Sequence, residues 1–267
     1  MTLLTEPTRI VLAKGYTLPD DADAVAYIAA VEAADGQALE TATRMAINSF
    51  VKGCKNDGIW NAIKASCILA GARTRLGALT PLAGTAPTSF NFVDGDYNRK
   101  TGLVGNGTTK YLNSNRNNNA DPQDSKHLAV FTTVFHTRNA TRACIGSGTG
   151  SFGDSHLITV EGPARVFFRL NVTDFGQALS SSATSTGLYG SSRASAAGYT
   201  GRFGGSSNFY IDTSTAPAAN NITVFARGGA NLSDARIAFY SIGESLDLAL
   251  LDTRVTTLIN AFAAAIP

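Results

Sequence analysis

The sequence predicts a mainly β protein: a β-sandwich or jelly-roll that carries an N-terminal helical segment and a C-terminal amphipathic helix. From about residue 76 onward, turn dipeptides separate short segments in which apolar residues recur with a period of two, as on the strands of a sheet. Residues 21–70 and 246–265 instead carry apolar residues at helical spacing. Strands that follow one another without intervening helices favour a sandwich over an alternating α/β fold.

The N-terminal part of the chain divides into an arm and a helical segment. Residues 1–20 are expected to form an extended arm, in which residues 8–12 either add a strand to a neighbour's sheet or belong to a frayed terminus. Residues 21–75 form the helical segment. We expect one helix after an N-cap at Asp21 or Asp23, a second over 41–52, and a third from Asp57 with one face formed by Ile59, Trp60, Ile63 and Cys67.

Residues 76–267 are expected to form the β-jelly-roll together with the last helix. The candidate strands are 89–93, 110–114, 127–137, 156–160, 165–172, 208–212, 222–227 and 236–242. Residues 178–207 are rich in Ser, Ala and Gly, and they predict either flexible loops or further short strands.

The C-terminal segment predicts an amphipathic helix over residues 246–265. Ser245 is the candidate N-cap, and Asp247 lies in the first turn, where a carboxylate complements the helix dipole. One face of this helix carries Leu248, Leu251, Val255, Leu258, Ile259, Phe262 and Ile266. Such a face must pack against another element, either the sandwich or the N-terminal helices.

Composition excludes several classes of function. The net charge is only +2 and the basic residues are scattered, so we expect no nucleic-acid partner. The sequence shows no apolar run of transmembrane length and no signal peptide, so we expect no membrane partner and no export signal. Cys54, Cys67 and Cys144 are odd in number and fit no metal-site spacing, which predicts buried, reduced thiols.

Three stretches of the chain carry a resemblance to a known family. They are Phe-Val-Lys-Gly-Cys-Lys-Asn-Asp-Gly-Ile-Trp at 50–60, followed by Ile-Leu-Ala-Gly-Ala-Arg-Thr at 68–74; the segment 96–114, which contains Asn-Arg-Lys-Thr-Gly-Leu-Val-Gly-Asn-Gly; and Ile-Ala-Phe-Tyr-Ser-Ile-Gly-Glu at 237–244. In this order they resemble tailed-bacteriophage virion structural proteins with a concanavalin-A-like jelly-roll of the LamG type, over roughly residues 45–265. In that family's pattern, the strand within the second stretch pairs near the final strand.

The resemblance implies a structural component of a phage particle that acts through protein–protein contacts. The component would be a capsid cement or decoration protein, or a tail-fibre or spike subunit. Its partners would be other virion proteins. The resemblance also favours a homo-oligomer, and among homo-oligomers it favours a trimer. The protein would be made in the host cytoplasm without an export signal and then reside in the virion.

The alternative function is a receptor-binding module that recognises host-surface glycan through the jelly-roll. Aromatic rings that recur between small residues would then offer stacking faces for sugars. The candidates are Tyr189, Tyr199, Phe203, Phe209 and Tyr210. The competing interpretation is that these rings pack in the core or within hairpins.

Enzymatic activity is not expected. Glycoside hydrolysis needs two carboxylates across the scissile bond, but the sandwich region contains only Glu161 and Glu244, both in turns. A Ser-His-Asp triad would need His127, His136 or His156, and no Gly-x-Ser-x-Gly elbow accompanies them between a strand and a helix. We therefore expect no catalytic residues and no organic cofactor.

Calcium is the one cofactor for which the sequence offers candidate ligands. Asp94, Asp96 and Asn98 place three oxygen-bearing side chains at alternating positions of a loop that contains glycine. Asn117–Asp121 and Asp124 supply more oxygens of the same kind. Such Asx-rich segments also form turns by bonding their own backbone, and this is the competing interpretation.

Overall fold

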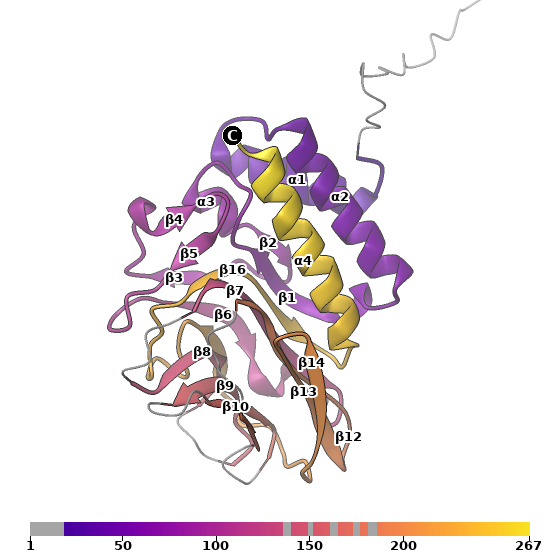
Figure 1. The fold of residues 1–267 in the computed structure, drawn as a ribbon, viewed down its shortest axis with the longest axis vertical. Coiled ribbons are helices and arrows are strands. Elements are labelled where there is room, and N and C mark those ends of the chain that lie inside the picture. Colours follow the sequence, from indigo (N-terminus) through magenta and orange to yellow (C-terminus); the bar gives the residue numbers. More distant parts are fainter. Residues whose placement is uncertain (1–18, 136–139, 149–151, 161–164, 173–176, 181–185) are drawn as a thin grey trace, which may run out of the picture.

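The computed structural model describes residues 19–135, 140–148, 152–160, 165–172, 177–180 and 186–267. Two antiparallel sheets face each other, and a layer of helices covers the outer face of one of them. Figure 1 shows α1, α2 and α4 on one side of the strands, with β8, β9 and β10 on the opposite side. The predicted fold class is confirmed: a mainly β sandwich with an N-terminal helical segment and a C-terminal helix.

The nine-stranded sheet lies in the middle of the molecule. Its main path runs β14 (Ser206–Ile211), β13 (Gly198–Phe203), β12 (Gly187–Ser195), β7 (Lys126–Val134), β16 (Arg236–Gly243), β1 (Ile63–Ile68) and β2 (Pro81–Ala83). Off this path, β5 (Gly102–Val104) pairs with β16, and β4 (Tyr97–Asn98) pairs with β5. Within the stretch 96–114, β5 pairs with the final strand β16. The strand predicted at 110–114 does not, because it forms β6 (Tyr111–Asn117), which pairs with two strands of the other sheet.

The seven-stranded sheet closes the other side of the sandwich. Its order is β11 (Gln177–Ser180), β10 (Arg165–Leu170), β9 (Ser155–Val160), β8 (Arg142–Gly146), β15 (Asn221–Val224), β6 (Tyr111–Asn117) and β3 (Thr88–Phe90). Each of the eight predicted segments overlaps an observed strand. Within residues 178–207, which the sequence left open between loops and strands, the described part forms β12, β13 and the end of β11.

The N-terminal helices are α1 (Ala22–Asp35) and α2 (Thr41–Asn56). Asp21 caps α1, as predicted, by accepting hydrogen bonds from the backbone N–H groups of Asp23 and Ala24. The predicted third helix is wrong, because the chain forms a short 3-10 helix at Trp60–Ala62 and then β1. The next α-helix along the chain, α3 (Arg75–Ala78), is a single turn. The predicted arm, residues 1–20, lies outside the described residues except for its last two.

The C-terminal helix α4 (Leu248–Ala265) buries the whole face that the sequence predicted. Its N-cap is Asp247 rather than Ser245, since Asp247 Oδ1 accepts from the N–H groups of Ala249 and Leu250. With 18 residues and a mean hydropathy of 1.2, α4 is long and apolar enough to cross a membrane by length and composition. Its apolar face packs on the sheet and on α2, and 33% of the helix is buried.

Two hydrophobic cores result from this arrangement. The helical core lies between the helices and the nine-stranded sheet, and the sandwich core lies between the two sheets. Strands β7 and β16 contribute to both, because alternate residues point to opposite faces: Ala129 and Phe131 enter the helical core, while Leu128 and Val130 enter the sandwich core. The three cysteines are buried and unpaired, as predicted.

Candidate functional site

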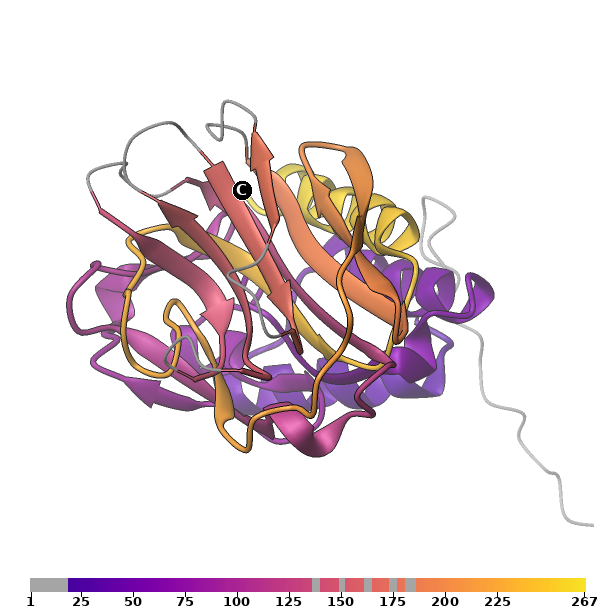
Figure 2. The same cartoon turned by 90° about the horizontal axis from the view of Figure 1, so that it is seen from below.

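A groove of about 510 Å³ lies on the outer face of β12–β14, beside the start of α4. Figure 2 shows α4 (yellow) next to these strands (orange). The strands contribute Ser192, Ala194, Ser195, Gly198, Tyr199, Thr200, Ser207 and Phe209, and the helix entry contributes Leu246, Asp247, Leu248 and Ala249. The groove is therefore built where a three-stranded ribbon extends beside a helix N-terminus.

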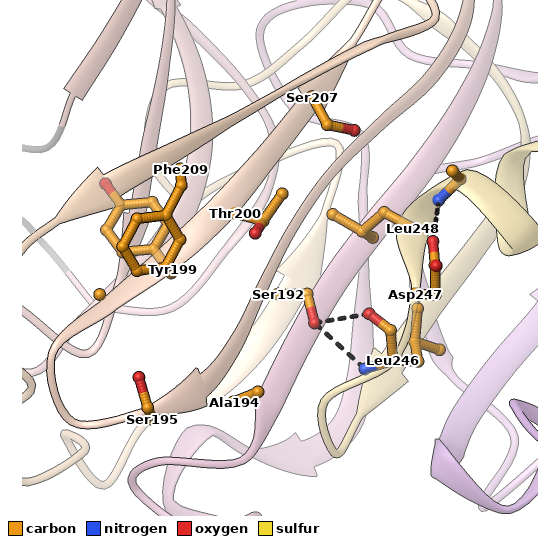
Figure 3. A pocket seen from close by; sticks show the side chains of 12 residues that line it. Ser192, Ala194, Ser195, Tyr199, Thr200, Ser207, Phe209, Leu246, Asp247 and Leu248 are labelled. Atoms are coloured by element: carbon orange, nitrogen blue, oxygen red, sulfur yellow. Dashed lines mark hydrogen bonds between the residues drawn. The ribbon is translucent and has the colours of Figure 1, made fainter.

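Three side chains make polar contacts that fix the turn leading into α4. Ser192 Oγ donates to the carbonyl of Leu246 at 2.8 Å and accepts from its N–H at 3.1 Å, as Figure 3 shows. Ser125 Oγ accepts from the N–H of Ser245 at 3.1 Å. His127 Nδ1 lies 2.6 Å from the carbonyl oxygen of Glu244. Because these anchors come from β12, from β7 and from the residue just before β7, the wall of the groove is held in a set position relative to its floor.

Phe209 is the prominent apolar group of the groove. Its side chain is 61% exposed, although most large apolar residues of the described chain are buried. A Cβ at Gly198 would come within 2.6 Å of the Phe209 ring, so the ring lies against the bare backbone of the neighbouring strand β13. Gly198 thus allows the ring to rest on the sheet with much of its surface open to solvent.

Besides Phe209, the groove is lined by both apolar and neutral polar residues, and it carries little free charge. Within the described residues, the hydroxyls of Ser195 and Thr200 have no hydrogen-bond partner. The carboxylate of Asp247 caps α4. Just outside the groove, Arg202 pairs with Asp252 of α4 at 2.8 Å and donates to Ser207 Oγ at 3.0 Å.

The structure corrects three of the predicted stacking residues. Tyr189, Tyr199 and Phe203 are 1%, 0% and 7% exposed and lie in the sandwich core, so none offers a free face to a ligand. The hydroxyl of Tyr199 donates to the carbonyl of Phe168 inside the sandwich. Tyr210 is partly buried, and its ring packs toward the same core. Of the five candidate rings, Phe209 is the one that the structure places on the surface of the groove.

The predicted calcium loop uses its side chains for internal bonds. Asp94 pairs with Arg75 at 3.0 Å, and Asp96 accepts from Lys110 Nζ at 2.5 Å and from the N–H of Val93 at 2.8 Å. Asn98 Oδ1 accepts from two backbone N–H groups that follow it in the chain. This is the turn-forming behaviour that the competing interpretation describes. Among the described residues, no three His, Cys, Asp or Glu side chains converge as a metal site.

The second acidic segment also pairs internally. Asp121 forms a bidentate ion pair with Arg116, and Asp124 Oδ1 accepts from the hydroxyl of Ser214 at 2.5 Å. These carboxylates therefore help to order the loop between β6 and β7.

The histidines and glutamates considered for catalysis do not form an accessible site. His127 Nε2 lies 2.7 Å from Ser241 Oγ, a geometry like that of a base and a nucleophile, but both residues are 0% exposed. Burial lowers the pKa of His127 to about 4 and holds the pKa of His156 well below its usual value. Glu244 pairs with Lys64 at 2.9 Å. His136 and Glu161 lie outside the described residues.

Comparison with known proteins supplies little beyond the fold. No protein-family model and no curated protein sequence matches the chain. A leech intramolecular trans-sialidase is 11% identical, with a TM-score of 0.37 over 50% of this chain and 24% of that one. The CBM40 of a Ruminococcus gnavus IT-sialidase, bound to α2,3-sialyllactose, is 15% identical, with a TM-score of 0.35 over 55% and 84% of the two chains.

A third similar structure is a mutant GH54 α-L-arabinofuranosidase, which is 9% identical with a TM-score of 0.42 over 60% of this chain and 41% of that one. The present chain thus spans less than half of the trans-sialidase and of the arabinofuranosidase. At TM-scores below 0.5, these likenesses carry no argument about function. None of them concerns a phage particle, so the virion role stays a prediction based on the sequence resemblance.

Proposed function

We propose that this protein is a binding module without catalytic activity, and that it recognises carbohydrate in the groove beside β12–β14. The observation that carries the proposal is the exposed Phe209 ring, which rests on Gly198 and lies in the same groove as the hydroxyls of Ser195 and Thr200. An exposed apolar side chain of this size needs an explanation when it lines a concave surface.

The chemistry of this groove suits a sugar ring. A pyranose has a face of C–H groups that can stack on an aromatic ring, and hydroxyls at its rim that exchange hydrogen bonds with Ser and Thr. A groove of about 510 Å³ falls within the range of small-molecule sites, which is roughly 300–1,000 Å³. Because the anchored α4 entry and the ribbon are already in place, binding would require little ordering of the chain.

A glycan array tests the proposal with two matched variants. Phe209→Ala removes the exposed ring, and Phe152→Ala makes the same change at a side chain that is 71% exposed and lies outside the groove. We expect the wild type and Phe152→Ala to bind the same glycans and Phe209→Ala to lose at least about tenfold in affinity. EDTA should leave binding unchanged, since the acidic loops are paired internally. Equal binding by all three proteins, or binding by none, would reject the proposal.

A second candidate function is a structural role through protein–protein contacts, in the setting of a phage particle. The observation in its favour is the outer edge of β14. This strand has six residues in unbroken register with β13, contains no charge and no proline, and exposes 85% of Ile211. The described edges at β2 and β3 are only three residues long, and β2 contains Pro81. Natural edge strands usually carry such protection against pairing, so an open edge favours a strand-pairing partner.

The oligomeric state tests this second function. If copies of the chain pair through β14, light scattering at micromolar concentration should show an oligomer, and Ile211→Lys should dissociate it while leaving the fold intact. The resemblance favours a trimer. A wild-type protein that is monomeric at every concentration would count against self-association, and a phage setting would then require a different virion partner.

A further inference from the structure

Resting on the proposed carbohydrate function, we propose that the groove selects uncharged sugars and discriminates against sugars that carry a carboxylate, sulfate or phosphate. The charged groups around the groove carry this inference. Three features matter: the carboxylate that lines it, the pairing of the cations beside it, and the neutral character of its free donors.

The carboxylate that lines the groove belongs to Asp247. This residue is exposed and caps α4, with Oδ1 2.7 Å from the N–H of Ala249 and 3.3 Å from that of Leu250. A helix N-terminus offers N–H groups and a partial positive charge to an anion. Here the carboxylate of Asp247 already accepts from these N–H groups and neutralises the partial charge. An anionic ligand would therefore meet a like charge where a bare helix N-terminus would attract it.

The cations that touch residues of the groove are also compensated. Arg193 is 0% exposed and donates to backbone carbonyls, among them those of Ser195 and Gly198. The guanidinium of Arg202 contacts Asp252 through Nε at 2.9 Å and through a terminal nitrogen at 2.8 Å, and its other terminal nitrogen donates to Ser207 at 3.0 Å. Its side chain is only 12% exposed. None of the described residues that line the groove is Lys, Arg or His. Recognition of carboxylates or sulfates generally uses such a cation in a forked, charge-assisted contact, and this groove does not offer one.

The free polar groups of the groove are neutral. The hydroxyls of Ser195 and Thr200 can each donate and accept, which matches the hydroxyls of an uncharged sugar. Phe209 stacks on C–H groups and gains nothing from a negative charge, because the face of an aromatic ring is itself the negative end of its quadrupole. The groove thus combines an apolar lining, in which Phe209 is the exposed platform, with two free neutral hydroxyls and one carboxylate.

Matched pairs of glycans test this selectivity on the full chain. Each pair contains a neutral oligosaccharide and the same core with one sialic acid or one sulfate, titrated at low and at high salt. We expect the neutral member to bind at least about tenfold more tightly, with an affinity that hardly depends on salt because no ion pair forms. Tighter binding of the anionic member, weakening as salt is added, would overturn the selectivity while leaving the carbohydrate function standing. If no glycan binds, the proposed function itself fails.

Asp247→Asn provides the decisive variant. Asn is as good an N-cap as Asp, so α4 should start at the same residue while the carboxylate is removed. We expect the ratio of neutral to anionic affinity to fall by about threefold or more. The matched control is Asp21→Asn, the same change at the N-cap of α1 and outside the groove, which should leave the ratio unchanged. An unchanged ratio in Asp247→Asn would overturn the role of this carboxylate in selectivity.

Discussion

The helical core and the sandwich core share strands β7 and β16, yet they are filled differently. The helical core is mostly aliphatic, with Ala, Val, Ile and Leu from α1, α2 and α4 around a few Phe and Tyr rings. The sandwich core collects more aromatic rings, and at one end it contains two cations that are 0% exposed, Lys126 and Arg193. These two residues lie opposite each other on β7 and β12.

Backbone carbonyl oxygens compensate the buried cations. Lys126 Nζ donates to the carbonyl of Asn118, and Arg193 donates to the carbonyls of Leu170, Ser195, Ala196, Gly198 and Asp212. The guanidinium of Arg193 also lies 5.3 Å above the ring of Tyr199. The helical core tolerates many apolar sequences, whereas this end of the sandwich depends on cations that must meet particular carbonyls.

The largest expected effect comes from Lys126. Burial lowers its pKa from 10.5 to about 7, so between these values the folded protein holds Lys126 neutral while the unfolded chain binds a proton. The contribution of Lys126 to stability should therefore rise with pH from about 7 to 10.5, by about 5 kcal/mol, and it is lost as pH falls to 7. Urea unfolding of the wild type and of Lys126→Met at several pH values measures this contribution as the difference between the two profiles, because the buried thiols oppose it above their usual pKa of 9.0 in both proteins. Parallel profiles of the two proteins would refute the assignment.

Cavities in the two cores provide the next test. Phe262 packs across Gly71 in the helical core, and Phe168 packs beside Tyr210 in the sandwich core. Truncation of either ring to Ala should cost about 3–5 kcal/mol. Because β7 and β16 bury one face in each core, both variants should shift a single unfolding transition. Far-ultraviolet circular dichroism follows the helices, and near-ultraviolet circular dichroism follows the packed aromatic rings, which are more numerous in the sandwich core. Two separate transitions would show that the cores unfold independently.

His127 lies on the helical face of β7 and should make stability depend on pH in the acidic range. Its pKa falls from 6.5 to about 4 because burial disfavours the charged ring. Between these values the unfolded chain binds the extra proton, so stability should decrease by about 3 kcal/mol as pH falls from 6.5 to 4. His127→Gln should flatten this part of the pH profile relative to the wild type. If the profiles superimpose, another group causes the acid sensitivity.

The smallest expected effect is slow labelling of the three buried thiols. It distinguishes the two cores directly, because each core contains at least one cysteine. Cys54 lies in the helical core, and Cys67 and Cys144 lie in the sandwich core. Burial raises the pKa of each to about 12, so the native protein should hardly react with a thiol reagent. Labelling followed by mass spectrometry then measures how often each core opens. Equal rates would indicate joint opening, and faster labelling at Cys54 would indicate that the helical layer detaches first.

The contrast between the cores explains which elements the sequence could predict. The apolar face of α4 follows helical spacing over its whole length, and all of its predicted members are buried. Strand β1 was taken for a helix because both of its faces are buried, one under the helices and one inside the sandwich, so it shows no alternation of polar and apolar residues. The carbonyl partners of Lys126 and Arg193 lie between two and 23 residues away along the chain. Every residue type carries a backbone carbonyl, so these contacts leave no sequence signal.

The segment that contains the candidate site could be predicted from the sequence, but the ring that faces the groove could not. Aromatic residues that recur between small ones indicated the correct segment. Which ring faces the solvent depends on the register of β14 against β13, and neighbouring residues on a strand point to opposite faces. Phe209 therefore faces the groove while Tyr210 packs toward the core. The contribution of α4 to the groove requires the anchors Ser125, His127 and Ser192, which contact residues more than fifty positions away in the sequence.

Helix α4 connects the groove to the end of the chain described here. It starts at the groove with Leu248 and runs for 18 residues, or roughly 27 Å, toward Pro267, which Figure 1 places among the helices. A tether attached after Pro267 would therefore hold the molecule by its helical side, with Phe209 at the far end of α4. On a biosensor chip, this orientation leaves the groove open to the solution, whereas a tether through an engineered cysteine on β14 would block it.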